Sequence, residues 1–161
     1  MKLVVAVVAM VGSAIGGSPS LLGALQAAPA PQSPPAPPSA SASTPSARSV
    51  WDGVYTAVQA RSGALTSGLC TSCHGDSFEG DRGPALTGPD FIERWNGRTV
   101  GDLFELIRLT MPDDDPGALT RQQYADLVAY ILAVNKLPAG NTEIGTQTEP
   151  LKLIRVDASK P

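Results

Sequence analysis

The clearest hydrophobic pattern in the chain covers residues 120–135. Apolar side chains recur there every three or four positions, as on the buried face of a helix, at Tyr124, Leu127, Val128, Ile131 and Leu132. Thr120 followed by Gln123 has the spacing of a capping box, in which each side chain hydrogen-bonds the backbone of the other residue. The pattern therefore predicts a helix from Thr120 to Asn135.

A second helix is predicted from Thr99 to Met111. Thr99 is a residue type that favours the N-cap, and Asp102 follows three positions later. An apolar stripe continues along this segment at Leu103, Leu106 and Ile107. The last residue of the predicted helix is followed by Pro112, which cannot continue a helix.

Two further helices are predicted upstream. Residues 51–68 predict a first helix whose positions near helical spacing are Val54, Val58, Arg61 and Leu65. Pro89 is a residue favoured in the first turn of a helix, and it predicts a short helix that reaches Trp95.

Strand patterns are almost missing from the sequence. The only alternating run, residues 151–156, lies in a tail that has no predicted place. Turns rich in glycine, proline or aspartate separate the helical segments at residues 80–84 and 113–117. We therefore expect an all-α fold in one domain, residues 50–161, with a C-terminal tail from about residue 138.

The first 28 residues predict an export signal. One early lysine precedes an apolar run over residues 3–15, which fits the core of a signal and is too short to span a bilayer alone. Cleavage is expected after Ala14 or around Ala27, and an uncleaved membrane anchor in the same segment is the alternative. Residues 16–19 argue against a continuous helix because they contain two glycines and a proline. Either form predicts a periplasmic or other extracytoplasmic location.

Residues 29–49 predict a disordered linker. They contain only proline, alanine, serine, glutamine and threonine, apart from one arginine. Such a segment cannot bury enough apolar surface to offset the entropy of ordering it, and its prolines favour an extended spacer. The whole chain has a formal net charge of −3, which argues against nucleic acid as a partner, since binding it requires basic patches.

The chain's two cysteines and its single histidine lie in one pentapeptide, Cys70-Thr71-Ser72-Cys73-His74. The C-x-x-C-H spacing is typical of covalent c-type haem attachment. Two thiols three positions apart can reach the two vinyl groups on one porphyrin edge, and the next residue can ligate the iron. The sequence therefore predicts one covalent haem c, attached through Cys70 and Cys73, with His74 as the proximal ligand.

Three other uses of this motif fit the sequence less well. A structural zinc site needs about four cysteine or histidine ligands, and three are present. A thioredoxin-like C-x-x-C lies in a βαβ context, which the predicted helices do not provide. A disulfide across two residues would be strained.

Met111 is the predicted second axial ligand. A cleaved signal would remove Met1 and Met10 and leave Met111 as the one methionine of the mature chain. A thioether opposite histidine raises the reduction potential of haem iron, and Pro112 restricts the chain beside it. The alternative is a methionine that only fills the core, which would leave a five-coordinate iron open to small molecules.

These motifs come in the order that resembles class I cytochromes c. The haem motif is followed by Gly83-Pro84-Ala85-Leu86, then by Met111-Pro112, and then by a last helix that contains Tyr130. The resemblance covers Trp51 to about Asn135. It implies the class I cytochrome c fold, in which a few helices surround one haem.

The resemblance also implies roles for single residues. Pro84 would offer its carbonyl to Nδ1 of His74, which fixes the ring and raises its basicity. Leu86 would pack on the haem face. Trp95 would pack at the haem edge or hydrogen-bond a propionate, with a plain core tryptophan as an equal alternative. Tyr130 would pack where the first and last helices cross.

One departure from the family pattern concerns this crossing. The first helix of class I cytochromes c usually carries glycine eight residues before the first cysteine and an aromatic residue four before it. Ser62 and Thr66 occupy these positions here, and Gly63 is one place off. The departure predicts a looser or shifted crossing.

Residues 51–55, residues 95–104 and the tail to Val156 look like small periplasmic monohaem cytochromes associated with quinoprotein (PQQ) dehydrogenases. This resemblance implies an electron carrier rather than an enzyme, with a dehydrogenase as donor and another cytochrome or an oxidase of a respiratory chain as acceptor. The alternatives are a haem sensor or peroxidase-like site, for which no second histidine exists, and a haem module of a larger complex. Residues 113–115, three aspartates, are either a solvated turn or an acidic rim that steers a basic partner.

Overall fold

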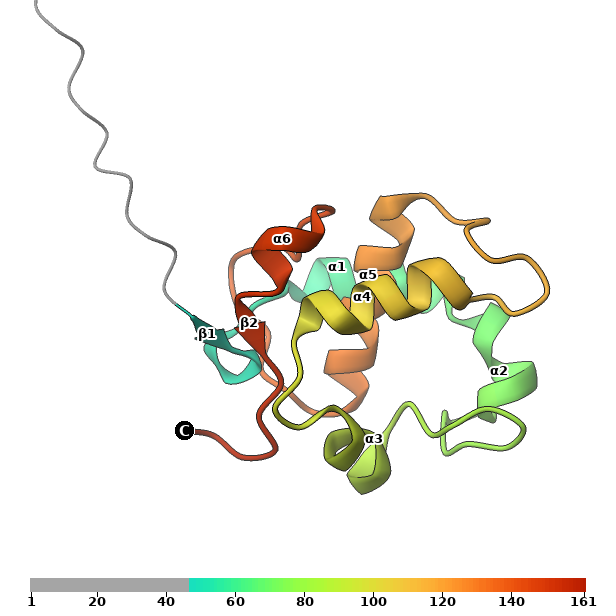
Figure 1. The fold of residues 1–161 in the computed structure, drawn as a ribbon, viewed down its shortest axis with the longest axis horizontal. Helices are drawn as coiled ribbons and strands as arrows, with labels where there is room; N and C mark the ends of the chain where they lie inside the picture. The colour runs from blue at the N-terminus through green and yellow to red at the C-terminus, as the bar shows by residue number, and fades with distance from the viewer. Residues whose placement is uncertain (1–46) are drawn as a thin grey trace, which may run out of the picture. The chain divides into compact units, whose positions relative to one another are not determined.

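The structure is a computed structural model that describes residues 47–161 (Figure 1). The predicted export signal and most of the predicted linker lie outside the described residues. The all-α prediction is confirmed, because helices account for nearly all regular structure in the described part. In chain order the elements are β1 (Arg48–Ser49), the 3₁₀ helix η1 (Val50–Asp52), α1 (Ala57–Thr66), α2 (Gly68–His74), α3 (Gly88–Trp95), α4 (Val100–Thr110), α5 (Arg121–Val134), α6 (Thr148–Leu151) and β2 (Ile154–Arg155). No helix among residues 47–161 is long and apolar enough to cross a membrane.

The two strongest predicted helix starts are present. Thr99 caps α4 and Thr120 caps α5, and each helix has a complete capping box, with Asp102 and Gln123 as the third residues. The threonine hydroxyl accepts from the backbone N–H three positions on, so that one of the free N–H groups of the first turn is paired. These local contacts explain why the sequence alone located both starts.

The first predicted helix was wrong in its bounds. The chain forms η1, turns at Gly53 with φ of 66°, and starts α1 only after the N-cap Thr56. Two of the apolar residues near helical spacing are exposed, Val58 at 59% and Leu65 at 90%. The residues of α1 that are buried instead are Gln59, Ala60 and Gly63.

The buried face of α1 is small because α1 packs closely across α5. A Cβ atom on Gly63 would lie 2.0 Å from the carbonyl oxygen of Asp126 and 2.8 Å from Cβ of Tyr130. Large apolar side chains therefore cannot occupy this crossing, and they lie on the outer face. The close contact falls at Gly63, and the crossing is therefore not the looser one that the departure from the family pattern allowed.

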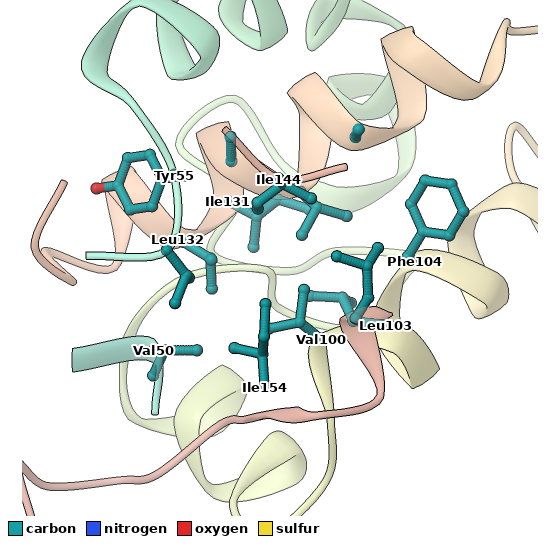
Figure 2. Packing of buried hydrophobic residues seen from close by; sticks show 14 of the residues in the cluster. Val50, Tyr55, Val100, Leu103, Phe104, Ile131, Leu132, Ile144 and Ile154 are labelled. Atoms are coloured by element: carbon teal, nitrogen blue, oxygen red, sulfur yellow. The ribbon is translucent and has the colours of Figure 1, made fainter. Parts of the chain in front are cut away.

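One hydrophobic core joins the long helices to the tail (Figure 2). Its largest fully buried side chains come from α3, α4 and α5 and from the segments at both ends of the domain: Tyr124, Phe91, Phe104, Leu103, Leu132, Ile144, Val50, Val54, Val100, Val128 and Val156. Burial of this apolar surface is the main favourable contribution to folding.

The tail after residue 138, which had no predicted place, packs along the domain. The buried amide of Gln59 donates from Nε2 to the carbonyl of Ile144 (2.9 Å) and accepts at Oε1 from the N–H of Ile144 (2.8 Å). Further on, β2 pairs in parallel with β1, with Arg48 opposite Ile154. Residues 48–49 fall at the end of the predicted linker, and they are part of the folded domain.

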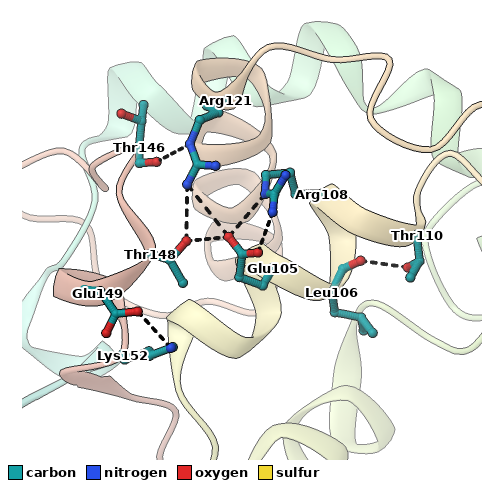
Figure 3. A network of polar contacts seen from close by, with 9 residues as sticks. All are labelled: Glu105, Leu106, Arg108, Thr110, Arg121, Thr146, Thr148, Glu149 and Lys152. Atoms are coloured by element: carbon teal, nitrogen blue, oxygen red, sulfur yellow. Dashed lines mark hydrogen bonds and ion pairs between the residues drawn. The ribbon is translucent and has the colours of Figure 1, made fainter.

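A polar cluster around Glu105 fastens the start of α6 to α4 and α5 (Figure 3). The Glu105 carboxylate pairs with Arg108 at 2.7 Å and with Arg121 at 3.8 Å, and it accepts a hydrogen bond from the hydroxyl of Thr148. Arg121 also donates from Nε to the carbonyl of Thr146 at 2.7 Å. The hydrogen bond from Arg108, and then that from Thr148, lower the pKa of Glu105 from 4.5 to about 2.

Candidate haem site

Helix α2 carries all three residues of the C-x-x-C-H motif. Cys70 and Cys73 are one turn apart, so that both thiols lie on the same side of the helix. His74 is the last residue of α2 and is only 6% exposed. Both cysteines are free thiols in this structure. Cys70 packs against the hydrophobic core, and its burial raises the pKa of the thiol.

The imidazole of His74 is held by the loop that follows α2. Its Nδ1 lies 2.6 Å from the carbonyl oxygen of Pro84, the contact that the resemblance to class I cytochromes implied. Because a carbonyl can only accept a hydrogen bond, the proton must be on Nδ1, and Nε2 then carries the lone pair that a metal ion binds. The ring is therefore oriented and in the tautomer that a proximal ligand needs.

Gly83 makes room for this ring. A Cβ atom at Gly83 would lie 2.8 Å from Cε1 and 2.9 Å from Nδ1 of His74, closer than a side chain could be placed without moving the ring. The N–H of Gly83 also donates to the carbonyl of Cys73 at 2.7 Å. In the sequence, Gly83 stands out only as the neighbour of Pro84. Its contact with the imidazole could not be predicted without the fold of the loop.

The loop between His74 and Leu86 is closed on itself and packed on α5. The N–H of Gly80 donates to the carbonyl of His74 at 2.7 Å, and the N–H of Leu86 donates to the carbonyl of Phe78 at 2.9 Å. Phe78 is buried, has a φ of 61°, and packs edge to face on Tyr130 of α5 with ring centroids 5.9 Å apart. Phe78 was not singled out in the sequence, where no local signal distinguished it.

Met111 directly follows α4, and both its backbone N–H and its backbone carbonyl are hydrogen-bonded. Its N–H donates to the carbonyl of Ile107 at 2.8 Å, and its carbonyl accepts from the hydroxyl of Tyr124 at 2.9 Å. The side chain is half-buried against the core. In Figure 1 the C-terminal end of α4 and helix α2 lie at the same end of the domain, away from β1 and β2.

The two other residues predicted to contact haem, Leu86 and Trp95, lie in different surroundings. Leu86 is half-buried beside the loop that holds His74. Trp95 is a buried member of the core, 6.3 Å from the ring of Phe91, with the guanidinium of Arg98 5.5 Å above its ring.

Residues 58–131 match the family model described as Cytochrome C oxidase, cbb3-type, subunit III. The match runs from α1 through most of α5 and contains the cysteine pair, His74 and Met111. The match supports a c-type cytochrome domain in this part of the chain. Comparison with curated proteins and with solved structures finds no match.

The cofactor of such a domain is covalently bound haem c, and the residues present suit it. The matched region has two free thiols on one side of α2, next to a histidine whose Nε2 is available to bind iron. The apolar surroundings of Cys70 and the close fit of Gly83 on the imidazole match a porphyrin edge and a rigid proximal ligand. Cys70 and Cys73 would hold the porphyrin, and His74 would hold the iron.

Proposed function

We propose that this cytochrome domain is a single-haem electron carrier that works by outer-sphere transfer in the periplasm. The observation that carries the proposal is the imidazole of His74, which follows two free thiols and is fixed through Nδ1 by the carbonyl of Pro84 at 2.6 Å. A ligand held in one orientation needs little rearrangement when the iron changes its charge, which favours rapid electron transfer.

Within this mechanism the chain's own residues bind, orient and exclude water. Haem c supplies a one-electron Fe(III)/Fe(II) couple when it is bound. Cys70 and Cys73 would fix the porphyrin to α2. The carbonyl of Pro84 keeps the proton of His74 on Nδ1 and raises the basicity of Nε2. The surrounding apolar side chains lower the polarity of the site and so influence the potential.

We further propose that Met111 is the second axial ligand. The two hydrogen bonds of its backbone, to Ile107 and from Tyr124, support a fixed position for the residue, and its half-buried side chain suits a thioether ligand. The alternative is an open sixth position, which would suit a haem sensor domain and would bind carbon monoxide readily.

The partners are proposed on chemical grounds. A carrier of this kind would accept electrons from a periplasmic dehydrogenase, with a PQQ-dependent enzyme as one candidate, and pass them to another cytochrome or an oxidase of a respiratory chain. The predicted export signal and the covalent attachment motif support this location. We regard the domain as a carrier rather than an enzyme by itself.

A second candidate function is that of a haem subunit in a larger complex. It is supported by the matching family model, whose description names a subunit of a cbb3-type oxidase. The predicted linker before the domain would then connect the haem to the complex. The two candidates differ in whether the chain purifies alone or with other subunits from its native membrane or periplasm.

Covalent haem is the first test. The full chain is expressed in a host with a c-type maturation system and is analysed by denaturing gel electrophoresis with haem staining. The wild-type chain and the control Ser72→Ala should retain haem, and the double variant Cys70→Ala, Cys73→Ala should lose it. A reversible one-electron wave in voltammetry and haem in the periplasmic fraction are also expected. A wild-type chain without covalent haem after maturation would overturn the proposal.

A further inference from the structure

Asn135, the residue that follows α5, has hydrogen bonds in two directions. Its side-chain Nδ2 donates to the carbonyl of Ile131 in its own helix and to the carbonyl of Leu86, both at 2.8 Å. Its Oδ1 accepts from the N–H of Gly88 at 3.0 Å. One half-buried amide therefore connects the end of α5 to the segment that follows Pro84.

Helix capping alone does not explain an asparagine at this position. Asparagine is favoured just after helices because it tolerates the left-handed conformation. Asn135 has φ of −82° and ψ of 9°, and the left-handed residue is Lys136 with φ of 61°. The backbone conformation of Asn135 therefore does not require asparagine, and its amide links the carbonyl of Ile131 at the end of α5 to Leu86 and Gly88.

The segment that Asn135 holds is the one that presents Pro84 to His74. The beginning of the loop is fixed to α2 by the hydrogen bonds from Gly80 to His74 and from Gly83 to Cys73, both at 2.7 Å. Leu86 comes two residues after Pro84, and Asn135 fixes it to α5. The carbonyl of Pro84 therefore lies between Gly83, which is hydrogen-bonded to α2, and Leu86, which is hydrogen-bonded to Asn135 at the end of α5.

We propose that Asn135 is a positioning residue for the proximal ligand, and this rests on the proposed haem function. Its amide holds residues 84–88 against α5, so that the carbonyl of Pro84 stays on Nδ1 of His74. A strong hydrogen bond at Nδ1 makes the imidazole a better electron donor and favours Fe(III). Loss of the Asn135 contacts loosens this bond and shifts the equilibrium toward Fe(II), so that the potential rises.

The test uses two variants of Asn135 and one control in the full holoprotein. Asn135→Leu removes both contacts with the loop, whereas Asn135→Asp keeps an acceptor for Gly88 and removes the donor to Leu86. The control is Asn96→Leu. Asn96 also follows a helix, α3, but its Oδ1 accepts from the N–H of Ala158 in the tail at 3.0 Å.

Two measurements report on His74 itself. One is the midpoint potential by voltammetry. The other is the solvent-exchange rate of the Nδ1 proton of His74 in the reduced protein, followed by NMR. We expect both Asn135 variants to favour Fe(II) about threefold more than wild type, which corresponds to about 30 mV at 59 mV per tenfold for one electron. The Nδ1 proton should exchange about tenfold faster, and Asn96→Leu should change neither value.

The outcomes separate this proposal from the proposed function. A wild-type chain without covalent haem would overturn both. If wild type carries haem and Asn135→Leu keeps the wild-type potential and exchange rate, Asn135 is only a structural residue. Equal shifts in Asn96→Leu and Asn135→Leu would also overturn the proposal, because they would reflect general loosening. If Asn135→Leu does not accumulate with haem, the same two measurements on the isosteric Asn135→Asp decide the matter.

Discussion

Gly63 of α1 lies directly against the backbone of Asp126 in α5. A Cβ atom at Gly63 would be 2.0 Å from the Asp126 carbonyl oxygen. This contact sets the distance between the two helices. Since α2, which carries Cys70 and His74, follows α1 after a single residue, the crossing also positions the attachment motif relative to α5.

Gly63→Ala should therefore destabilise the protein although alanine is the better helix former. The added methyl must push α1 away from α5, and overpacking of this kind costs about 1–3 kcal/mol. The control is Gly68→Ala at the start of α2, where a Cβ atom would meet nothing within 4 Å. Urea unfolding of both holoproteins is the measurement, and equal stabilities of the two variants would contradict a close crossing.

Met111→Ala should change the haem rather than the fold. If Met111 is the axial ligand, its loss should abolish the weak red absorbance band that oxidised His/Met haems show, lower the potential and open the iron to carbon monoxide or imidazole. Met111→Leu serves as the matched variant, because it keeps most of the side-chain volume and removes the sulfur. An unchanged band and potential in both variants would rule Met111 out as ligand.

Acid should weaken the attachment of α6 through Glu105. The pKa of Glu105 is lowered from 4.5 to about 2 by Arg108 and Thr148. Its stabilising effect is therefore complete above about pH 4.5 and disappears as the pH falls through 2. Because the carboxylate is a quarter exposed, we expect Glu105→Gln to cost only about 1 kcal/mol at pH 7.

Unfolding at pH 7, 4.5 and 2.5 checks this prediction. The difference between wild type and Glu105→Gln should shrink at the lowest pH. The control Glu149→Gln removes the pair with Lys152, in which the carboxylate is 82% exposed, and it should have little effect at any pH. A constant difference for Glu105→Gln would mean that the carboxylate charge contributes nothing.

Replacement of all three aspartates at residues 113–115 by asparagine tests the acidic rim. All three are exposed and follow Met111 closely. If they steer a basic electron donor, electron transfer between the donor and the triple variant should be slower than with wild type at low salt. The difference should fade as the Debye length falls from about 30 Å at 0.01 M to about 10 Å at 0.1 M. Stopped-flow rates at several ionic strengths are the measurement, and identical rates with identical salt slopes would reduce the run to a solvated turn.

The parts of the fold that the sequence predicted are those determined by local contacts. The capping boxes at Thr99 and Thr120 act within one turn, and the C-x-x-C-H motif is contained in one helix. The buried face of α1 could not be predicted from local contacts. Apolar spacing favoured Val58 and Leu65, whereas the crossing with α5 requires a residue without a side chain at Gly63.

The tail and the loop contacts depend on residues far apart in the chain. Gln59 binds Ile144, and Asn135 binds Leu86 and Gly88. The sequence around such a polar residue does not indicate which distant backbone group its side chain will hydrogen-bond. Pro84 was the exception, because its pairing with His74 was implied by a family pattern.

The short pairing of β1 with β2 has a mechanical consequence. The chain enters the folded domain at Arg48, whose N–H donates to the carbonyl of Leu153 at 2.9 Å. In Figure 1 this junction lies at the far end of the domain from α2. A pull on the chain at Arg48 is therefore borne first by the pairing of β1 with β2. The imidazole of His74 and its partner Pro84 are not part of this pairing.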